Sequence, residues 1–461
     1  MMPGEAKRVA IVGAGPAGVR AAERLVKAGL APIVIDEGFS AGGQIYRRPP
    51  GGEVKDYSAS YGADASRARA IHQAFARIGE RIDYRPQTLA WNIRENRLWI
   101  ARDGNAEAIA FDALLLATGA LDRSIPVPGW DLPGCYTMGG SQIALKAHGC
   151  AIGERVAFVG TGPLLYLVAW QYSKAGATVV SVLDTAPRGS QLRAIPGLLA
   201  RPDFLMRGAR FRADLARQRI PVHTGATPLR IEGADDVERL VWEDASGREH
   251  VETIDAVALG FHLRSETQLA DLAGVAFSFD DTLSQWVPQR DASGRTGVRG
   301  IYMAGDGARV LGADAAEAGG RLAACAILAD LGRAVDVQEV ERLQASMTKF
   351  ERFRDALATA FPWPAALAAG VADDAQICRC ENITAGQLRE VASLKGAPEL
   401  NRAKALSRVG MGRCQGRYCG PAAAEILAAC QGKSLDAVGR MRGQAPVKPL
   451  SGALKMKDAD A

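Results

Sequence analysis

Four cysteines near the end of the chain have a spacing that predicts a metal or iron–sulfur centre. One residue separates Cys378 from Cys380, thirty-three residues separate Cys380 from Cys414, and four residues separate Cys414 from Cys419. Four thiolates in two close pairs suit a tetrahedral zinc ion or a [2Fe-2S] cluster. Because paired zinc cysteines usually have more than one residue between them, the first pair favours the cluster over zinc or unliganded thiols. Glycines around the second pair leave backbone N–H groups free to reach cluster sulfurs: Gly410, Gly412, Gly416 and Gly420.

The remaining cysteines do not form a second motif. Residues 1–370 contain no Cys-x-x-Cys pair, and Cys135 has no second cysteine at that spacing. A reductase that works through a dithiol needs such a pair, so this class of reaction is excluded. We expect the scattered thiols to be buried and inert: Cys135, Cys150, Cys325 and Cys430.

A glycine-rich motif near the start of the chain predicts a dinucleotide site. The pattern indicates a strand over 8–12, a helix over 19–28 and a second strand over 32–36. Glycine allows the tight turn, the close approach of backbone to pyrophosphate and the packing of helix on strand, while an acid after the second strand holds ribose hydroxyls. Spacing favours Asp36 over Glu37 for that acid. The predicted contacts are Gly13, Gly15, Pro16, Ala17, Gly18, Asp36 and Glu37.

A second, weaker motif begins about 147 residues later. It retains Gly160 and Gly162 after a strand over 156–159, but Leu165 occupies the place of the third glycine. The loss of that glycine hinders close helix–strand packing and therefore the usual dinucleotide geometry. Asp184, at the end of the next strand, could hold a ribose and argues against NADP. The open alternatives for this site are NAD, another adenine nucleotide, or a relic domain without a ligand.

The first motif, together with three later segments, resembles the pyridine nucleotide–disulfide reductase superfamily. The resemblance implies FAD at the first site, with Asp306 facing the ribityl–pyrophosphate region and a helix beginning near residues 315–320 directing its N-terminus at the flavin. It also implies an α/β fold with two Rossmann-like dinucleotide-binding domains, of which the FAD domain is discontinuous. The three segments supply Gly43, Gln44 and Arg47; Ala117, Thr118 and Gly119; and Gly305 and Asp306.

These motifs and a change in composition after Phe350 divide the chain. Pro362 and Pro364 break the preceding helix and mark a linker. The expected parts are an FAD-binding domain at 1–123 and 286–354, a second dinucleotide-type domain at 124–285, a linker at 355–375, a small, mainly helical [2Fe-2S] domain at 376–445, and a flexible tail at 446–461.

The cysteine segment resembles the [2Fe-2S] domain of bacterioferritin-associated ferredoxins, with all four ligand positions filled. From about residue 7 to about residue 442 the chain is similar to the α subunits of heteromeric opine and amino-acid dehydrogenases, a family that includes octopine and nopaline oxidase A subunits, D-hydroxyproline dehydrogenase and hydrogen cyanide synthase. The resemblance implies that an amino-acid-oxidase-like flavoprotein β subunit oxidises the C–N bond of an opine or secondary amino acid. This chain then carries electrons to an acceptor without a catalytic acid or base of its own. A small γ subunit is a further expected partner, and a stand-alone NADH-dependent reductase of a small redox protein is the alternative function.

Composition adds three expectations. No apolar run approaches the ~18 residues that a membrane span needs, and the N-terminus lacks a signal-peptide layout, so we expect a cytoplasmic protein. The net charge of +5 is too small to indicate nucleic-acid binding. The segment from Asn401 to the end contains eleven Lys and Arg but only four Asp and Glu. This local positive charge is either a solvated basic surface or compensation for an anionic cluster.

Overall fold

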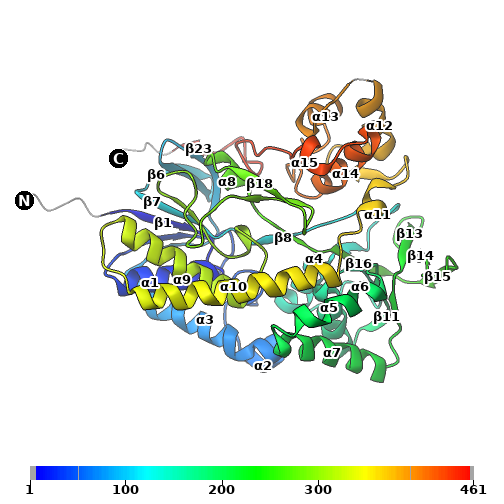
Figure 1. Ribbon diagram of the computed structural model, residues 1–461, viewed down its shortest axis with the longest axis horizontal. Coiled ribbons are helices and arrows are strands. Elements are labelled where there is room, and N and C mark those ends of the chain that lie inside the picture. Colours follow the sequence, from blue (N-terminus) through cyan, green and yellow to red (C-terminus); the bar gives the residue numbers. More distant parts are fainter. Residues whose placement is uncertain (1–6, 50, 395, 457–461) are drawn as a thin grey trace, which may run out of the picture.

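The structure is a computed structural model that describes residues 7–49, 51–394 and 396–456. Two α/β domains lie side by side, and a smaller helical domain sits above the second (Figure 1). Helix α10 (Val337–Ala360) runs beneath both larger domains and contacts α9 (Ala313–Asp330) of the first and α6 (Arg188–Leu198) of the second. The predicted α/β class, with two Rossmann-like domains and a mainly helical C-terminal domain, is confirmed.

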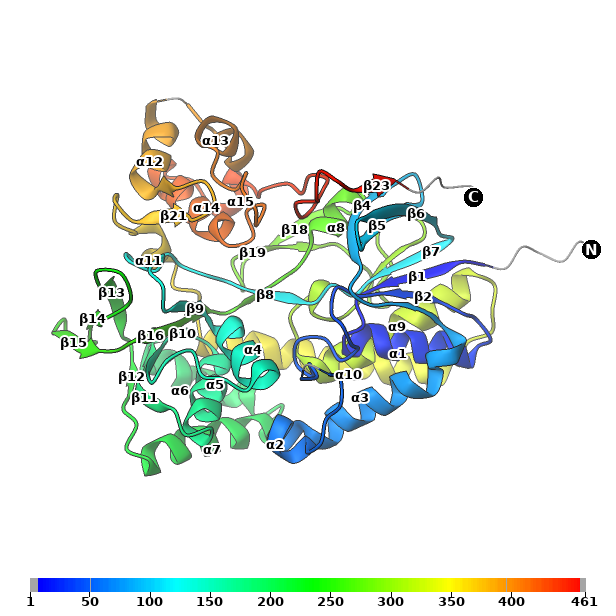
Figure 2. The same ribbon diagram turned by 180° about the vertical axis from the view of Figure 1, so that it is seen from behind.

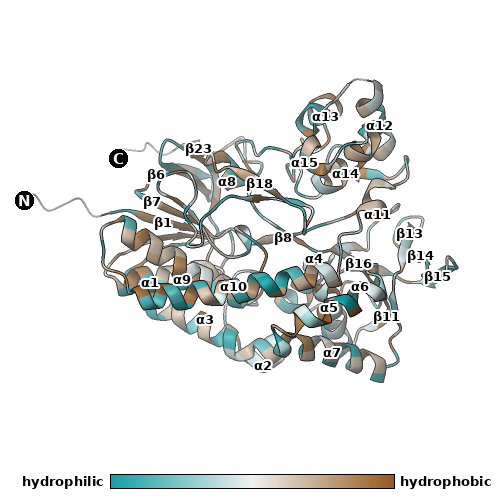
Figure 3. Cartoon of the chain, viewed as in Figure 1, coloured by the Kyte–Doolittle hydropathy of each residue, from teal (hydrophilic) through white to brown (hydrophobic). Residues whose placement is uncertain are grey.

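The first domain is built on a parallel sheet of five strands. Its central strands β1 and β7 are buried at every position, as expected for a parallel sheet covered on both faces. Helices α1 (Pro16–Lys27), α3 (Ala65–Ile78) and α9 pack together beside it, and Figure 3 shows hydrophilic residues along much of the neighbouring α10. The strand order is β20 (Ile301–Met303), β7 (Ala113–Leu116), β1 (Val9–Val12), β2 (Ile33–Ile35), β3 (Asp83–Arg85).

The second domain repeats this plan. Its five strands are also parallel, and helices α4 (Met138–His148), α5 (Pro163–Lys174) and α7 (Pro202–Arg217) accompany them. An antiparallel sheet of three strands, β13 (Thr227–Glu232), β14 (Arg239–Glu243) and β15 (Glu249–Thr253), extends from it. The order of the main sheet is β12 (Val222–Thr224), β11 (Thr178–Asp184), β10 (Arg155–Thr161), β16 (Ala256–Phe261), β9 (Cys135–Thr137).

A two-stranded ribbon joins the two domains. Strand β8 (Ala120–Asp122) leaves the first domain and pairs antiparallel with β17 (Leu263–Ser265), which returns to it. Figure 2 shows β8 crossing between the domains. The segment after β17 holds α8 (Gln268–Leu272), β18 (Phe277–Asp280) and β19 (Gln285–Pro288). Because Leu269 and Val275 share a hydrophobic cluster with Ala10 of β1, the chain rejoins the first domain well before the expected boundary at 285.

The C-terminal segment differs from the expectation of a flexible tail. Val447 is buried, and its N–H donates to Trp91 O at 3.1 Å. Strand β23 (Lys455–Met456) then pairs with β6, so residues 446–456 pack on the first domain; residues 457–461 lie outside the described residues. The sheet that β23 extends contains β4 (Leu89–Arg94), β5 (Arg97–Arg102) and β6 (Asn105–Ala110).

The C-terminal domain contains short helices around the cysteine loop. Its core is continuous with that of the second domain, since Trp130 and Val257 belong to the same cluster as Ile377 and Ile426. The expected linker is packed as well: Trp363 donates to Glu425 at 2.5 Å, and Arg123 lies 3.4 Å from the Trp363 ring centroid. The elements are α11 (Ala365–Ala369), β21 (Gln376–Cys378), β22 (Ile383–Thr384), α12 (Ala385–Leu394), α13 (Leu400–Ser407), α14 (Cys419–Gln431) and α15 (Leu435–Val438).

Shorter elements complete the fold: α2 (Tyr57–Tyr61) and the 3-10 turns Gly62–Asp64, Gly79–Arg81 and Gly305–Gly307. Among the residues that the structure describes, no helix is both long enough and apolar enough to cross a bilayer.

Candidate cofactor-binding site

The first glycine motif is a site of close backbone contacts. A Cβ on Gly13 would lie 2.3 Å from Ala117 O, and one on Gly18 would lie 1.8 Å from Gly13 O. A Cβ on Gly43 would lie 2.9 Å from Gly15 Cα. These distances are shorter than side-chain contacts allow, so glycine is required where the three segments meet.

Helix α1 begins at this meeting point with its N–H groups uncapped by a side chain. Gly15 is the N-cap residue, and Pro16 is at the start of the helix. Free N–H groups at a helix N-terminus attract anions, and the absence of side chains permits close approach of a pyrophosphate. The donors and the glycine cradle therefore fit the diphosphate of FAD.

The segment Gly305–Gly307 also contacts the first glycine motif and the Ala117–Gly119 segment. A Cβ on Gly305 would lie 2.8 Å from Ala17 Cβ, and one on Gly307 would lie 2.6 Å from Thr118 Oγ1. Asp306 Oδ1 accepts hydrogen bonds from the N–H groups of Leu311 and Gly312 at 2.9 and 3.0 Å, and burial raises the pKa of its carboxyl. Gly312 is the N-cap of α9, which begins at Ala313, slightly earlier than predicted.

The two acids after β2 have different surroundings. Asp36 accepts hydrogen bonds from Ala14 N at 2.5 Å and from Gly38 N at 2.6 Å, so it lies directly against the glycine motif. Burial raises the pKa of the Asp36 carboxyl. Glu37 instead pairs with Lys448 Nζ at 2.5 Å on the surface. This placement supports Asp36 rather than Glu37 as the residue beside the nucleotide.

Two further features lie at this domain's edge. Exposed Gln44 accepts hydrogen bonds from Arg47 Nε and Nη2 at 3.1 and 2.9 Å, so these two residues, both predicted to contact the cofactor, bond to each other.

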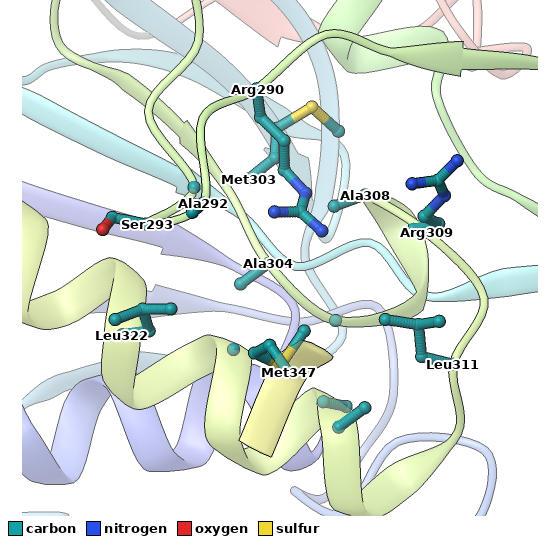
Figure 4. A pocket seen from close by; sticks show the side chains of 15 residues that line it. Arg290, Ala292, Ser293, Met303, Ala304, Ala308, Arg309, Leu311, Leu322 and Met347 are labelled. Carbon is teal, nitrogen blue, oxygen red and sulfur yellow. The ribbon is translucent and has the colours of Figure 1, made fainter. Parts of the chain in front are cut away.

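A cavity of about 20 Å³ lies beside Gly305, with Arg290 and Met347 among its lining (Figure 4). That volume holds about one water molecule, so this cavity is not the flavin site.

The second motif has a free helix N-terminus but lacks the third glycine. Gly162 is the N-cap residue of α5, no side chain caps this helix, and a cavity of about 150 Å³ adjoins the motif. Leu165, in the place of the third glycine, is buried in the apolar core behind the motif. A Cβ on Gly160 would lie 1.7 Å from Gly260 O, so this glycine allows two strands to approach each other.

Asp184 is enclosed rather than presented to a ligand. Its side chain is 0% exposed and accepts hydrogen bonds from Tyr166 Oη at 2.6 Å, Gln191 Nε2 at 2.8 Å and Ala186 N at 2.9 Å. Burial raises the pKa of its carboxyl to about 6. The structure therefore does not support the prediction that Asp184 holds a ribose, because its carboxylate is fully buried, whereas Asp36 at the first motif is only partly buried.

The four predicted cluster cysteines come together between β21 and α14. Cys419 Sγ donates hydrogen bonds to Cys378 and Cys414, and Cys414 is also linked to Cys380. Among the described residues, no group of three or more His, Cys, Asp or Glu side chains is arranged to hold a metal ion. Four cysteines are the ligand set of a [2Fe-2S] cluster and also of a structural zinc ion, so the preference for the cluster comes from the spacing of Cys378 and Cys380.

Hydrogen bonds favour the thiolate form at two of these positions. The Cys419 thiol, with backbone N–H groups of Gly410 and Glu381, lowers the pKa of Cys378 to about 6. The Cys419 thiol likewise lowers the pKa of Cys414 to about 5, with help from the N–H of Gly416. Thiolates are the form that binds metal, and N–H donors to sulfur are typical of cluster sites.

Comparison with known proteins identifies both parts of this arrangement. Residues 7–327 match the family described as pyridine nucleotide-disulphide oxidoreductase, and residues 376–429 match the BFD-like [2Fe-2S] binding domain. The A-type subunit of opine oxidase from Rhizobium meliloti is 36% identical over 96% of this chain and 86% of its own length. This chain belongs to the family of opine oxidase A-type subunits. It is a flavin-dependent oxidoreductase with FAD and a [2Fe-2S] cluster as its cofactors.

Another relative is also named as a subunit, and a solved structure has the same fold. A hydrogen cyanide synthase subunit of Pseudomonas aeruginosa is 29% identical over 96% of this chain and 97% of its own length. The crystal structure of L-proline dehydrogenase from P. horikoshii has the same fold, with a TM-score of 0.69 at 22% identity over 98% of this chain and 80% of that chain.

An ion pair links the cluster loop to the segment that contacts the FAD motif. Arg417 Nε donates to Glu266 Oε2 at 2.7 Å, and both side chains are largely buried. The Glu266 backbone is bonded on the other side to the FAD domain, where its O accepts from Thr118 Oγ1 at 2.6 Å and its N–H donates to Gly119 O at 2.9 Å. Arg417 Nη1 also donates to Cys414 O at 3.3 Å.

Sequence reasoning missed this pair and a methionine beside it. A Cβ on Gly410 or Gly416 would lie 2.5 Å from Met441 Sδ, so Met441 covers the cluster loop. Arg417 lies between two cluster cysteines, and that position was the available signal for it. Glu266 belongs to no sequence motif, because its role depends on β17 lying next to the cluster loop in the folded protein.

Proposed function

We propose that this chain is the FAD- and [2Fe-2S]-containing α subunit of a heteromeric dehydrogenase that acts on the C–N bond of an opine or secondary amino acid. The substrate would be of the octopine, nopaline or D-hydroxyproline type. A flavin of an amino-acid-oxidase-like β subunit would supply the electrons, and this chain would pass them to an acceptor. A small γ subunit is a further proposed partner.

The link from Thr118 through Glu266 to Arg417 carries the proposal. It ties the loop of Cys414 and Cys419 to the Ala117–Gly119 segment of the FAD site by a short series of hydrogen bonds. When bound, the flavin supplies two-electron chemistry and the cluster supplies one-electron chemistry. The residues of this chain hold the two sites next to each other and need not act on a substrate.

Two groups of contacts make this docking rigid. Gln268 Nε2 donates to Gln415 O at 2.7 Å, and Arg264 Nη1 donates to Arg417 O at 3.2 Å. Nearby, Arg440 forms two hydrogen bonds with Asp271 at 2.7 and 2.8 Å. These bonds join the C-terminal domain to β17 and the segment after it, which supports a fixed distance between the cofactor sites.

The names of the relatives support a partner subunit. Those relatives are called subunits of opine oxidase and hydrogen cyanide synthase, and the similarity extends over nearly the whole chain. A subunit that only transfers electrons needs no catalytic acid or base of its own.

An anaerobic titration tests the proposal. NADH is added to the purified protein while flavin and cluster absorbance are followed, and dithionite serves as the positive control. We expect no bleaching by NADH and full bleaching by dithionite. Addition of an amino-acid-oxidase-like flavoprotein from the same organism as the candidate β subunit, with octopine or D-hydroxyproline, should then bleach both cofactors. Failure of this flavoprotein to reduce the chain would contradict the subunit proposal.

One observation favours the alternative of a stand-alone NADH-dependent reductase. The uncapped N-terminus of α5 adjoins the cavity of about 150 Å³ at the second glycine motif. Leu165 and the enclosed Asp184 count against dinucleotide binding there. Rapid bleaching by NADH in the same titration would establish this alternative.

A further inference from the structure

Helices α6 and α7 carry an unusual concentration of exposed apolar side chains. Of the ten large apolar side chains exposed in the described chain, five lie between residues 192 and 206. Soluble proteins rarely expose apolar groups together unless the surface binds something. We name this the α6–α7 patch, consisting of Leu192, Ile195, Leu199, Phe204 and Met206, with exposed fractions of 66%, 43%, 58%, 36% and 67%.

Helix α6 is apolar on two opposite faces. Ala194 and Leu198 face α10, where they form a cluster with Phe353 and Ala356. A Cβ on Gly197 would lie 2.7 Å from Ala356 Cβ, so the two helices are in close contact. The opposite face presents Leu192, Ile195 and Leu199, whose spacing of three and four residues aligns them in one stripe. Packing in this chain explains the first face and leaves the second without a partner among the described residues.

The surface around this stripe is basic. Residues 188–217 contain seven Arg and two Asp, and Asp64 and Asp314 from other segments lie against two of these arginines, so the surface has an excess of three positive charges. Some of these arginines are held in place by the rest of the chain: Arg201 pairs with Asp314 at 3.0 Å, and Arg207 pairs with Asp64 at 2.9 Å. An apolar centre with a charged rim is the composition of a protein interface, where arginine is enriched.

The positive charge around the α6–α7 patch helps to decide what binds there: a second copy of this chain, a membrane or another protein. A symmetric dimer through this patch would place the same arginine rim against itself, since a twofold interface brings like surfaces together. A helix that binds a membrane surface lies in the plane of the interface with its apolar face in the lipid, whereas α6 is already fixed on α10. A folded partner with an acidic rim around an apolar centre matches both features.

We propose that the α6–α7 patch is the docking surface for the flavoprotein β subunit, whose contacting face is apolar at its centre and acidic at its rim. This inference rests on the proposed function, because it assumes that such a subunit exists. It assigns the contact to the side chains of the second domain, which also gives that domain a role independent of any nucleotide.

Paired substitutions test the surface. The chain is co-expressed with the candidate flavoprotein β subunit, and the complex is isolated by size exclusion in its cofactor-loaded form. Leu192→Asp and Leu199→Asp should each weaken the complex at least about tenfold, because a charge replaces a central apolar contact. Val251→Asp and Val337→Asp are matched controls on other surfaces, with exposed fractions of 58% and 67%, and should leave the complex unchanged.

A second pair of variants tests the rim. Arg193→Glu and Arg210→Glu reverse two exposed charges of the segment, and we expect slower association and a weaker effect of salt on binding. Flavin and cluster absorbance, together with the melting temperature, show that each variant remains folded and loaded.

The outcomes separate the two proposals. If the wild-type chain does not bind the flavoprotein, the proposed function fails. If the wild-type chain and both leucine variants bind equally well, the function stands and the docking surface is wrong. Self-association of the wild-type chain that Leu199→Asp abolishes, or leucine-dependent binding to phosphatidylglycerol vesicles, would also overturn this assignment.

Discussion

Cys414 accepts hydrogen bonds from a thiol and from backbone N–H groups, which hold it as a thiolate for the cluster. We predict that Cys414→Ser abolishes the cluster absorbance and the bound iron while FAD remains, because the flavin motif lies in a different domain. Cys430→Ser is the matched control, since this exposed cysteine lies outside the cluster loop. Iron analysis and visible spectra measure both variants, and full iron content in Cys414→Ser would contradict the ligand assignment.

Asp184 links the second domain to a measurable pH effect. Burial raises the pKa of its carboxyl from 3.8 to about 6, so the folded state binds a proton more tightly than the unfolded state does. The free energy of unfolding should therefore fall as pH rises from about 4 to 6, by roughly 3 kcal/mol for this group at most. Asp184→Asn removes this contribution, so urea unfolding of the variant should depend less on pH in this window. Equal pH dependence in both proteins would show that Asp184 titrates normally.

At the residue scale, the sequence identified groups whose chemistry depends on local spacing. The cysteine pairs and Gly13, Gly15 and Gly18 could be predicted because their function follows from residue type and separation along the chain. Asp184 could not, because a carboxylate at the end of a strand binds ribose only if it is exposed. Its three partners, Tyr166, Gln191 and Ala186, are set by packing that no short motif encodes.

At the scale of elements, the loop before α14 depends on its ion pair with the segment after β17. Arg417 and Glu266 have side chains only 7% and 14% exposed, so removal of one partner leaves a buried charge unpaired. We predict that Arg417→Gln and Glu266→Gln each cost about 3 kcal/mol of stability and slow electron exchange between flavin and cluster. Rapid-mixing reduction followed at flavin and cluster wavelengths measures the exchange.

The double variant distinguishes positioning from simple loss of stability. Because the two residues form one pair, Arg417→Gln with Glu266→Gln should cost less than the sum of the single variants. The exposed pair Arg102–Asp103 offers a control, with Arg102→Gln expected to change neither stability nor exchange. Additive costs, or exchange at the wild-type rate in both single variants, would contradict a positioning role.

Strands and helices near the motifs were predictable, whereas their assembly was not. The apolar runs at β1 and β2 and the helix after Gly18 appear as expected, since periodicity is a local signal. The return of the chain at β17 differs from the expected boundary near 285, because α8 packs on the first sheet through Leu269. That packing follows from three-dimensional contact with residues that are far away in sequence, those of β4 among them.

At the scale of the whole molecule, the C-terminal segment connects parts that are distant in sequence. Val447 O accepts a hydrogen bond from Arg417 Nη1 at 2.7 Å, so the segment also supports the cluster loop. Lys448 pairs with Glu37 beside the first motif, and β23 adds a strand to β6. The expectation of a flexible tail came from its polar, Gly- and Pro-containing composition, which does not reveal that a single buried valine anchors it.

Deletion of this segment should therefore destabilise both the cluster loop and strand β6. Removal of residues 446–461 exposes the Val447 site and deprives buried Arg417 of one acceptor, at a cost of roughly 2–4 kcal/mol. We expect a lower melting temperature and faster hydrogen exchange in β6 and in the loop of Cys414 and Cys419, measured by mass spectrometry. Removal of residues 457–461 alone leaves β23 and Val447 in place and should preserve wild-type exchange. If the longer deletion also leaves exchange in the cluster loop unchanged, then Glu266 alone is sufficient to hold Arg417, and the segment packs on the first domain without stabilising the cluster site.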